Sequence, residues 1–212
     1  MQPPQPPAIP LWLRLASVAF LCVLVPVYWR HYGPSNFLWF SDIALFMATA
    51  AMWLGGARIG RSRPGPLLAS MAALCALVAD TAWSLDFLVH LLTGYEVTGM
   101  TSYMFDAKVP LHLRLISLFH LPLPPLLVWL VWRLGYDRRA LVAQTLLAWG
   151  IYLVTYAIGP EKNINWTFGP GYTVQKVVHP LVYLGVVMII YPLAAHVPAH
   201  LVLRNVFRPP PD

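Results

Sequence analysis

Six long apolar stretches, separated by short turn-rich segments, constrain this chain more than any other feature of its sequence. A membrane hydrocarbon core about 30 Å thick is crossed by a helix of roughly 20 apolar residues. The stretches run from Leu11 to Trp29, Phe37 to Leu54, Leu67 to Leu92, Leu111 to Leu134, Leu141 to Ile158 and Val174 to about Leu203. The sequence therefore predicts an all-α fold, an integral membrane bundle of about six transmembrane helices.

The composition excludes an ordinary soluble domain. Hydrophobic residues make up 58% of the chain and charged residues 10%, whereas about 25% of a typical soluble domain is charged. The net charge of +6 comes from residues dispersed beside the apolar stretches, so we expect no nucleic-acid partner. Cys22 and Cys75 both lie inside apolar stretches, where cysteine behaves as a small hydrophobic residue, and no disulfide framework is expected.

The distribution of basic residues predicts the orientation of the bundle. Nine of the fourteen Lys and Arg residues lie beside the N-terminus, in the second and fourth loops or in the C-terminal tail: Arg14, Arg58, Arg61, Arg63, Arg133, Arg138, Arg139, Arg204 and Arg208. Basic loops stay in the cytoplasm, so both termini are predicted there. We expect a Pro-rich cytoplasmic tail over residues 1–10, a six-helix transmembrane domain over 11–203 and a short basic, Pro-rich cytoplasmic tail over 204–212.

Ionisable residues inside the stretches gather, on this topology, in the outer half of the membrane. They are Asp42, Asp86, His90, His112, Arg114, His120, Lys176 and His179, with Asp80 nearer the middle. A charged group in hydrocarbon costs roughly 2.5–3.5 kcal/mol on insertion scales, so such residues face a bundle interior or a wet cavity and are paired. We therefore expect a polar cavity that opens outward between the second, third, fourth and sixth stretches.

Spacing suggests which of these residues act together. Asp86 and His90 are four residues apart and share one helix face. Histidine suits proton transfer near neutral pH and metal binding, so His112 and His179 are predicted as acid–base or metal-ligand groups, with Asp86 and His90 orienting them. The predicted catalytic set is thus His112, His179, Asp86 and His90, and the metal-ligand candidates are His90, His112 and His179.

The predicted substrate-binding residues lie around the mouth of this cavity. They are Arg114, His120, Asn163, Asn165, Trp166 and Asp42. The guanidinium of Arg114 suits either a phosphate or carboxylate clamp or a counter-ion for a nearby aspartate, and both alternatives remain open. His196 and His200, four residues apart at the inner end of the last stretch, are interpreted as interfacial histidines near the lipid headgroups.

A family resemblance adds to this interpretation. From Pro110-Leu111-His112-Leu113 through Gly159-Pro160 to Phe168 and His179-Pro180, the C-terminal half resembles the YwaF-like bacterial integral membrane proteins, which combine a Pro-Leu-His motif opening one span with a later histidine opening another. The resemblance implies a multi-pass protein of the bacterial cytoplasmic (inner) membrane. Eukaryotic relatives of that family are implicated in lipid acyl transfer through a cysteine and a histidine, which implies a role for His179.

Two classes of function follow from these observations. The first is a lipid-modifying enzyme, hydrolase or acyltransferase-like, that acts on membrane lipids through an outer-leaflet cavity lined by His and Asp. The alternative is a non-catalytic membrane subunit that binds a cofactor or quinone or forms part of a proton pathway, or a structural or assembly protein whose polar residues only pair helices. The sequence identifies no particular cofactor.

Overall fold

The fold is an all-helical membrane bundle, as predicted from the apolar stretches. The computed structural model describes residues 9–60, 63–171 and 173–209, and this part of the chain contains no β-strand. Its helices are α1 (Leu11–Tyr32), α2 (Phe40–Leu54), α3 (Pro64–Thr93), α4 (Leu111–Ser117), α5 (Leu123–Leu134), α6 (Ala140–Ile158), α7 (Pro180–Tyr191) and α8 (Val197–Val206). Shorter turns of 3-10 or π type are η1 (Pro34–Leu38), η2 (Ser102–Met104), η3 (Leu118–His120), η4 (Ile164–Trp166) and η5 (Pro192–His196).

Five helical segments of the described chain are long and apolar enough to cross a membrane: Leu11–Tyr32, Pro64–Thr93, Leu111–Leu134, Ala140–Ile158 and Pro180–Val206. The second predicted span is shorter than expected, because Pro34–Leu38 forms a 3-10 turn and Trp39 is extended, so α2 has only 15 residues. At 1.5 Å per residue α2 is about 22 Å long, less than the hydrocarbon core. The last span begins at Pro180 instead of Val174, because Pro180 occupies the first turn of α7.

Two of the spanning segments are interrupted rather than continuous. Between α4 and α5 the chain passes through the 3-10 turn η3, just before Pro122 and Pro124. Between α7 and α8 it passes through the π turn η5, which begins at Pro192. Proline removes a backbone donor and clashes with the preceding helical turn, so these breaks follow from the sequence. The first break carries His120, which belongs to the site described below.

The centre of the bundle is the pair α2 and α3, which pack closely through small residues. Ala44, Ala48 and Ala51 on α2 and Ala69, Ala72, Ala73 and Ala76 on α3 are all fully buried. A Cβ atom added to Gly65 would lie 2.6 Å from the Cα of Gly55, so the two backbones meet where α2 ends and α3 begins. Small residues at helix interfaces allow this close approach in membranes. The close packing of α2 and α3 therefore fixes the positions of the side chains that lie between these two helices.

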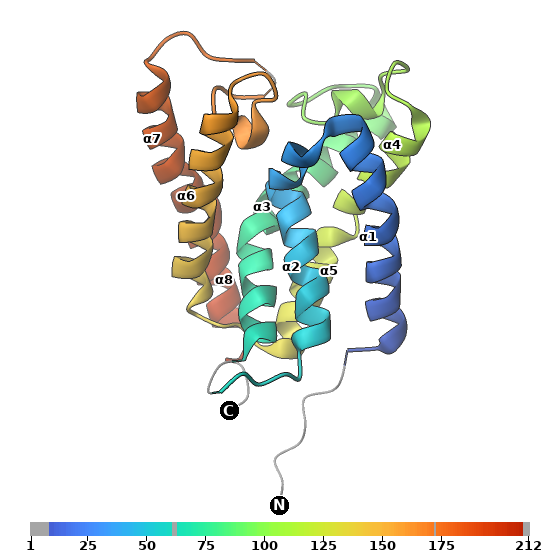
Figure 1. Ribbon diagram of the computed structural model, residues 1–212, viewed down its shortest axis with the longest axis vertical. Helices are drawn as coiled ribbons and strands as arrows, with labels where there is room; N and C mark the ends of the chain where they lie inside the picture. The colour runs from blue at the N-terminus through green and yellow to red at the C-terminus, as the bar shows by residue number, and fades with distance from the viewer. Residues whose placement is uncertain (1–8, 61–62, 172, 210–212) are drawn as a thin grey trace, which may run out of the picture.

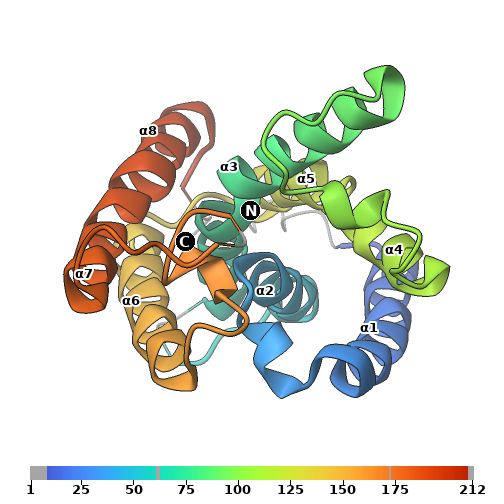
Figure 2. The ribbon, with the colours of Figure 1, turned by 90° about the horizontal axis from the view of Figure 1, so that it is seen from above.

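The remaining helices surround this pair (Figures 1 and 2). Helices α6, α7 and α8 lie on one side of it, and α1 and α4 lie on the other. Helix α1 is tied to α4 by a hydrogen bond of 2.8 Å between the hydroxyls of Tyr28 and Ser117. Helix α1 begins and α8 ends at the same end of the bundle, as the predicted topology requires, while the side of the membrane stays a prediction. Residues 1–8 and 210–212 of the predicted tails lie outside the described residues.

Candidate functional site

An aspartate and a histidine meet inside the bundle. The Nδ1 atom of His120, on η3, lies 2.9 Å from Oδ1 of Asp80, in the middle of α3. Asp80 is only 1% exposed. The hydroxyl of Ser41, from the first turn of α2, donates to the same carboxylate oxygen over 2.6 Å. Charged side chains in a membrane interior are costly unless paired, and this arrangement gives Asp80 two partners from two other elements.

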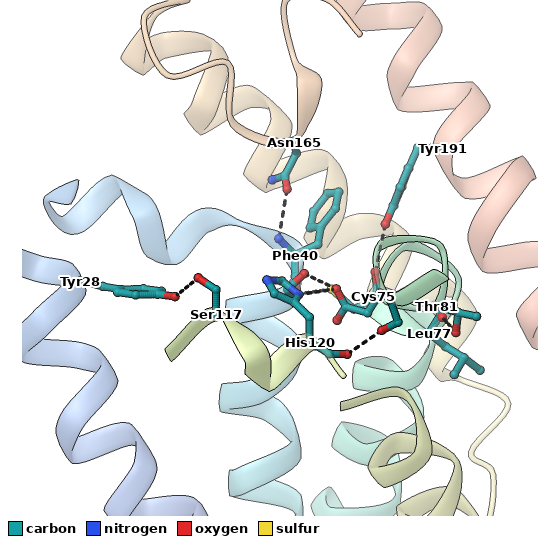
Figure 3. A network of polar contacts seen from close by, with 12 residues as sticks. Tyr28, Phe40, Cys75, Leu77, Thr81, Ser117, His120, Asn165 and Tyr191 are labelled. Carbon is teal, nitrogen blue, oxygen red and sulfur yellow. Dashed lines mark hydrogen bonds and ion pairs between the residues drawn. The ribbon is translucent and has the colours of Figure 1, made fainter. Parts of the chain in front are cut away.

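The ring of His120 is held by two aromatic rings, and its backbone is held by a hydrogen bond. The indole of Trp83 stacks on it with centroids 4.5 Å apart, and the ring of Phe119 lies 4.3 Å away on a nearly parallel plane. The hydroxyl of Ser84, one turn beyond Asp80, donates to the carbonyl oxygen of His120 over 3.1 Å (Figure 3). Because ring, backbone and Nδ1 are all restrained, the direction in which the second ring nitrogen points is restrained too.

That second nitrogen, Nε2, is left unpaired. No hydrogen bond of the described part of the chain involves Nε2 of His120, and the side chain keeps 15% of its surface exposed. A carboxylate that holds one imidazole nitrogen fixes the tautomer and stabilises the protonated ring, while the other nitrogen gives or takes protons. The Asp80–His120 pair therefore has the geometry of an oriented general acid–base.

The loop between α6 and α7 holds the start of α2, where Ser41 lies. The amide side chain of Asn165 accepts a hydrogen bond from the backbone N–H of Phe40 over 3.0 Å and donates to the carbonyl of Leu38 over 2.8 Å. The thiol of Cys75 donates to the carbonyl of Phe40, and the hydroxyl of Tyr191 donates to the carbonyl of Cys75. Figure 3 shows this chain of contacts from Asn165 to Tyr191. It joins α2, α3 and α7 beside the Asp80–His120 pair.

The same loop adopts an uncommon backbone conformation. Asn163, Asn165 and Trp166 have positive φ angles of 40°, 51° and 58°, a region that non-glycine residues rarely occupy. The amide of Asn163 stabilises the loop, since its nitrogen donates to the carbonyls of Gly169 and Gly171 and its oxygen accepts from the N–H of Phe168. Trp166 is 37% exposed. Asn163 thus shapes the loop, and Asn165 connects it to α2.

Asp42 is a second buried carboxyl group close to this site. It follows Ser41 directly, is 3% exposed and lies near enough to Asp80 for the two charges to interact. Its Oδ2 atom accepts a long hydrogen bond of 3.4 Å from the amide of Asn36, and its Oδ1 atom has no partner. Such an incompletely paired carboxyl costs folding energy. Oδ2 of Asp80 is likewise buried without a partner, but Oδ1 of Asp80 has two partners within 2.9 Å, whereas Asp42 has only the long contact with Asn36.

Asp86 and His90 share a face of α3, but each engages the following loop instead of the other. The carboxylate of Asp86 accepts hydrogen bonds from the N–H of Thr98 and from both the N–H and the hydroxyl of Thr101, at 2.7–3.2 Å. The ring of His90 stacks on Phe105 with centroids 3.8 Å apart. Both side chains therefore hold the loop between α3 and α4 in place.

Arg114 also contacts the loop between α3 and α4. Its Nη1 atom donates to the carbonyl oxygen of Met104 over 3.2 Å, and no ion pair joins it to an aspartate among the described residues. The counter-ion alternative therefore finds no aspartate partner among the described residues, and the guanidinium instead donates to a backbone carbonyl of the loop between α3 and α4. The clamp alternative stays a prediction.

His112 and His179 lie on opposite sides of the bundle. His112 is exposed on α4, with its ring 5.1 Å from that of His31 of α1. His179 is exposed before α7, where its Nδ1 accepts a hydrogen bond from the N–H of Leu181. Figure 2 shows α4 and α7 on opposite flanks of α2 and α3. The structure therefore does not combine these two histidines in one site.

The described residues hold no group of three or more His, Cys, Asp or Glu side chains that could bind a metal ion. In particular, His90, His112 and His179 are separated: His90 packs on the loop after α3, His112 lies against α1 and His179 caps α7. The three metal-ligand candidates are thus not brought together.

The interpretation of His196 and His200 as interfacial histidines is wrong. His196 is 0% exposed and His200 is 7% exposed. The Nδ1 atom of His196 lies 3.3 Å from the hydroxyl of Thr145, and that of His200 lies 2.7 Å from the hydroxyl of Tyr136. The π turn η5 rotates the following helix relative to a regular α-helix, and both rings face the protein core instead of the headgroups.

Sequence reasoning noted Asp80 without giving it a role and placed His120 among substrate-binding residues. The signal available was an acidic residue in the middle of an apolar stretch; its partner, forty residues away, carries no sequence signature. Comparisons of the chain with models of protein families, with curated proteins and with solved structures found no match.

Proposed function

We propose that this protein is a membrane-embedded enzyme that uses the Asp80–His120 pair for acid–base chemistry on a lipid or lipid-like molecule. The observation that carries the proposal is the distance of 2.9 Å between Nδ1 of His120 and Oδ1 of Asp80, combined with a free Nε2. The multi-pass membrane fold supports a substrate that partitions into the bilayer.

The chemistry follows from the orientation of the ring. With Nδ1–H donated to Asp80, the lone pair of Nε2 accepts a proton from a hydroxyl group of the substrate or from an attacking water molecule. The carboxylate of Asp80 stabilises the imidazolium that forms. Nε2–H then returns the proton to the leaving group, so the pair ends in its starting state. The hydrogen bond from Ser41 keeps Oδ1 oriented throughout.

The surroundings suit an amphipathic substrate. Trp83 and Phe119 stack on the imidazole. Trp83 also belongs to a small apolar cluster with Phe87 and Met104. Apolar walls strengthen the electrostatic interaction between Asp80 and a protonated His120. Within this proposal, Asn165 acts as a positioning residue, since it fixes the start of α2 and thereby Ser41.

We also propose that both termini lie in the cytoplasm of a bacterial cell and that the site serves the outer leaflet. The support is the concentration of Lys and Arg near the termini and in the second and fourth loops. Glycerophospholipids of that membrane are then the nearest available substrates, and a hydrolysis or acyl-transfer reaction needs no group beyond the general acid–base described here and water or a lipid hydroxyl.

A reconstitution experiment tests the proposed activity. The wild type, His120→Gln and Asp80→Asn are incorporated into vesicles of phosphatidylethanolamine and phosphatidylglycerol, and lipid products are quantified by mass spectrometry. His112→Gln and His179→Gln are matched controls on exposed histidines. We expect turnover by the wild type and both controls, and a loss of about 100-fold or more in the two site variants, the usual contribution of general acid–base catalysis. Undiminished turnover in His120→Gln would contradict the proposal.

A further inference from the structure

An apolar groove runs along the outside of the bundle between α6 and the last spanning segment. It has a volume of about 290 Å³ and is lined by Leu141, Val142, Thr145 and Trp149 of α6, Pro192 of η5 and Val197 of α8. The Thr145 hydroxyl is engaged with buried His196, and the Trp149 indole donates to the carbonyl of Met188 over 2.7 Å. The groove therefore presents apolar atoms at membrane depth, and Trp149 fixes one of its ends.

Two arginines stand at the other end of the groove. Arg138 lies four residues before Val142, and Arg204 lies seven residues after Val197. Arg204 therefore shares a face of α8 with Val197, about 10 Å away along the helix axis, and Arg138 lies in the turn directly before α6, three residues before the lining residue Leu141. Helix α6 begins and α8 ends at the same end of the bundle (Figure 1), so Arg138 and Arg204 both lie near that end.

The side chains of Arg138 and Arg204 are exposed, and neither forms an ion pair or a side-chain hydrogen bond with another described residue. The neighbouring Arg139 differs, because its guanidinium is engaged by the carboxylate of Asp137 at 2.7 Å. Leu201, 41% exposed, lies on α8 between Val197 and Arg204 and continues the apolar surface toward the charges. This face thus combines the apolar groove with two arginines that form no ion pair. Both arginines lie near the end of the groove at the membrane surface.

We propose that this face, formed by the α6–α8 groove with Arg138 and Arg204, binds one anionic phospholipid. An acyl chain lies in the groove as far as Trp149, and the phosphate group accepts hydrogen bonds from the two guanidinium groups, whose planar forks suit phosphate oxygens. Basic residues at the membrane surface beside a groove between helices recognise anionic headgroups. None of the lining residues belongs to the Asp80–His120 pair, and the site does not depend on the proposed enzymatic activity.

Native mass spectrometry of the detergent-solubilised protein tests the site. Dioleoyl phosphatidylglycerol and dioleoyl phosphatidylcholine, which have the same chains, are titrated onto the wild type and onto the variants Arg138→Gln/Arg204→Gln and Arg58→Gln. Arg58 is an exposed arginine in the loop between α2 and α3. The Arg58→Gln variant controls for the loss of a positive charge away from the groove. We expect tighter binding of phosphatidylglycerol to the wild type, and a loss of about five-fold per groove arginine, or about 25-fold in the double variant. Arg58→Gln should bind like the wild type.

A second pair of variants tests the apolar part of the site. Val142 is 64% exposed at the groove, and Val182 is 57% exposed on α7 outside it, so Trp at either position is tolerated by the fold. Val142→Trp should weaken phosphatidylglycerol binding at least five-fold, and Val182→Trp should not. Equal affinity for the two lipids, an equal effect of Arg58→Gln, an unaffected Val142→Trp variant, or displacement of the lipid by inorganic phosphate alone would each overturn the proposal.

Discussion

His120 and Asp80, forty residues apart in the chain, lie 2.9 Å apart, Nδ1 to Oδ1, between η3 and the middle of α3. The pair exists because two sequence features coincide in space. The proline-rich segment that starts at Pro122 ends α4 early and turns the chain, which carries His120 toward α3. The close packing of α2 on α3 brings the hydroxyl of Ser41 to the same carboxylate. Stability and chemistry are therefore coupled at this position.

The first prediction concerns the energetic coupling of the pair. Replacing His120 by Ala leaves Asp80 buried without its main partner, and replacing Asp80 by Ala leaves Nδ1 of His120 and the hydroxyl of Ser41 unpaired. Each single change should destabilise the protein by about 3–5 kcal/mol. The double variant should lose clearly less than the sum of the two, as shown by a double-mutant cycle in detergent-based unfolding. Simple additivity would show that the two side chains do not interact.

A second prediction concerns Asp42, whose Oδ1 atom is buried without a partner. Asp42→Asn preserves the shape of the side chain and removes a carboxyl group whose charged form is costly in this environment. The variant should be as stable as the wild type or more stable, by about 1–2 kcal/mol. Asp80→Asn, measured beside it by thermal unfolding in detergent, should be destabilised. An equal loss of stability in Asp42→Asn and Asp80→Asn would contradict this prediction, because it would show that the carboxylate of Asp42 is also stabilised by a partner.

A third prediction concerns the link between the α6–α7 loop and α2. Asn165→Ala removes the hydrogen bonds to Phe40 and Leu38 and leaves the positive φ of 51° without its polar compensation. A loss of about 2–3 kcal/mol in unfolding free energy is expected. Asn205→Ala, at an exposed position of α8, should change stability by less than about 0.5 kcal/mol. An equal effect of the two substitutions would argue against the proposed link.

A fourth prediction concerns acid stability and Asp137, which lies in the loop between α5 and α6. Burial acts to raise the pKa of Asp137, but hydrogen bonds from the side chain and backbone of Arg139, together with its charge, outweigh burial and lower the pKa below its ordinary value of 3.8. Because the folded pKa is the lower one, the unfolded chain binds the proton more readily. The stabilisation is present above about pH 4 and is lost as the pH falls through the folded pKa.

Asp137→Asn tests this dependence. The variant should unfold at a lower temperature than the wild type near neutral pH, and the difference should shrink as the pH falls below the ordinary value of 3.8 for an aspartate. The measurement is the midpoint of thermal unfolding in a detergent stable to acid. A difference that stays constant across the acid range would show that Asp137 contributes through its shape and not through its charge.

The arrangement of spans was largely predictable, because the length of an apolar stretch is fixed by the thickness of the hydrocarbon core. The exception is α2, and the reason is local. Gly33 with a positive φ of 78° and Pro34 direct the chain into a 3-10 turn, which consumes residues that hydropathy alone assigned to the second span. Hydropathy measures polarity and does not register where a helix begins.

Individual candidate residues of the site were predictable from the sequence, but the contacts that these residues form were not. Spacing within one helix placed Asp86 and His90 on a common face, but spacing does not reveal that Thr98 and Thr101 return from the loop to satisfy Asp86. The pairing of Asp80 with His120 depends on how α3 faces η3, which is a property of tertiary packing. His196 shows the same limit, since its burial depends on how the last spanning segment packs against α6, where Thr145 lies.

The most direct measurement is labelling of the folded protein with diethyl pyrocarbonate, which modifies accessible imidazole nitrogens, followed by peptide mass spectrometry. Exposed His112 and His179 provide the upper reference for reactivity, and fully buried His196 provides the lower one. The account predicts that His120 is modified through its free Nε2, and that Asp80→Asn changes its rate of modification because Asp80 no longer sets the tautomer. A His120 as unreactive as His196, or one indifferent to Asp80, would contradict an open acid–base site.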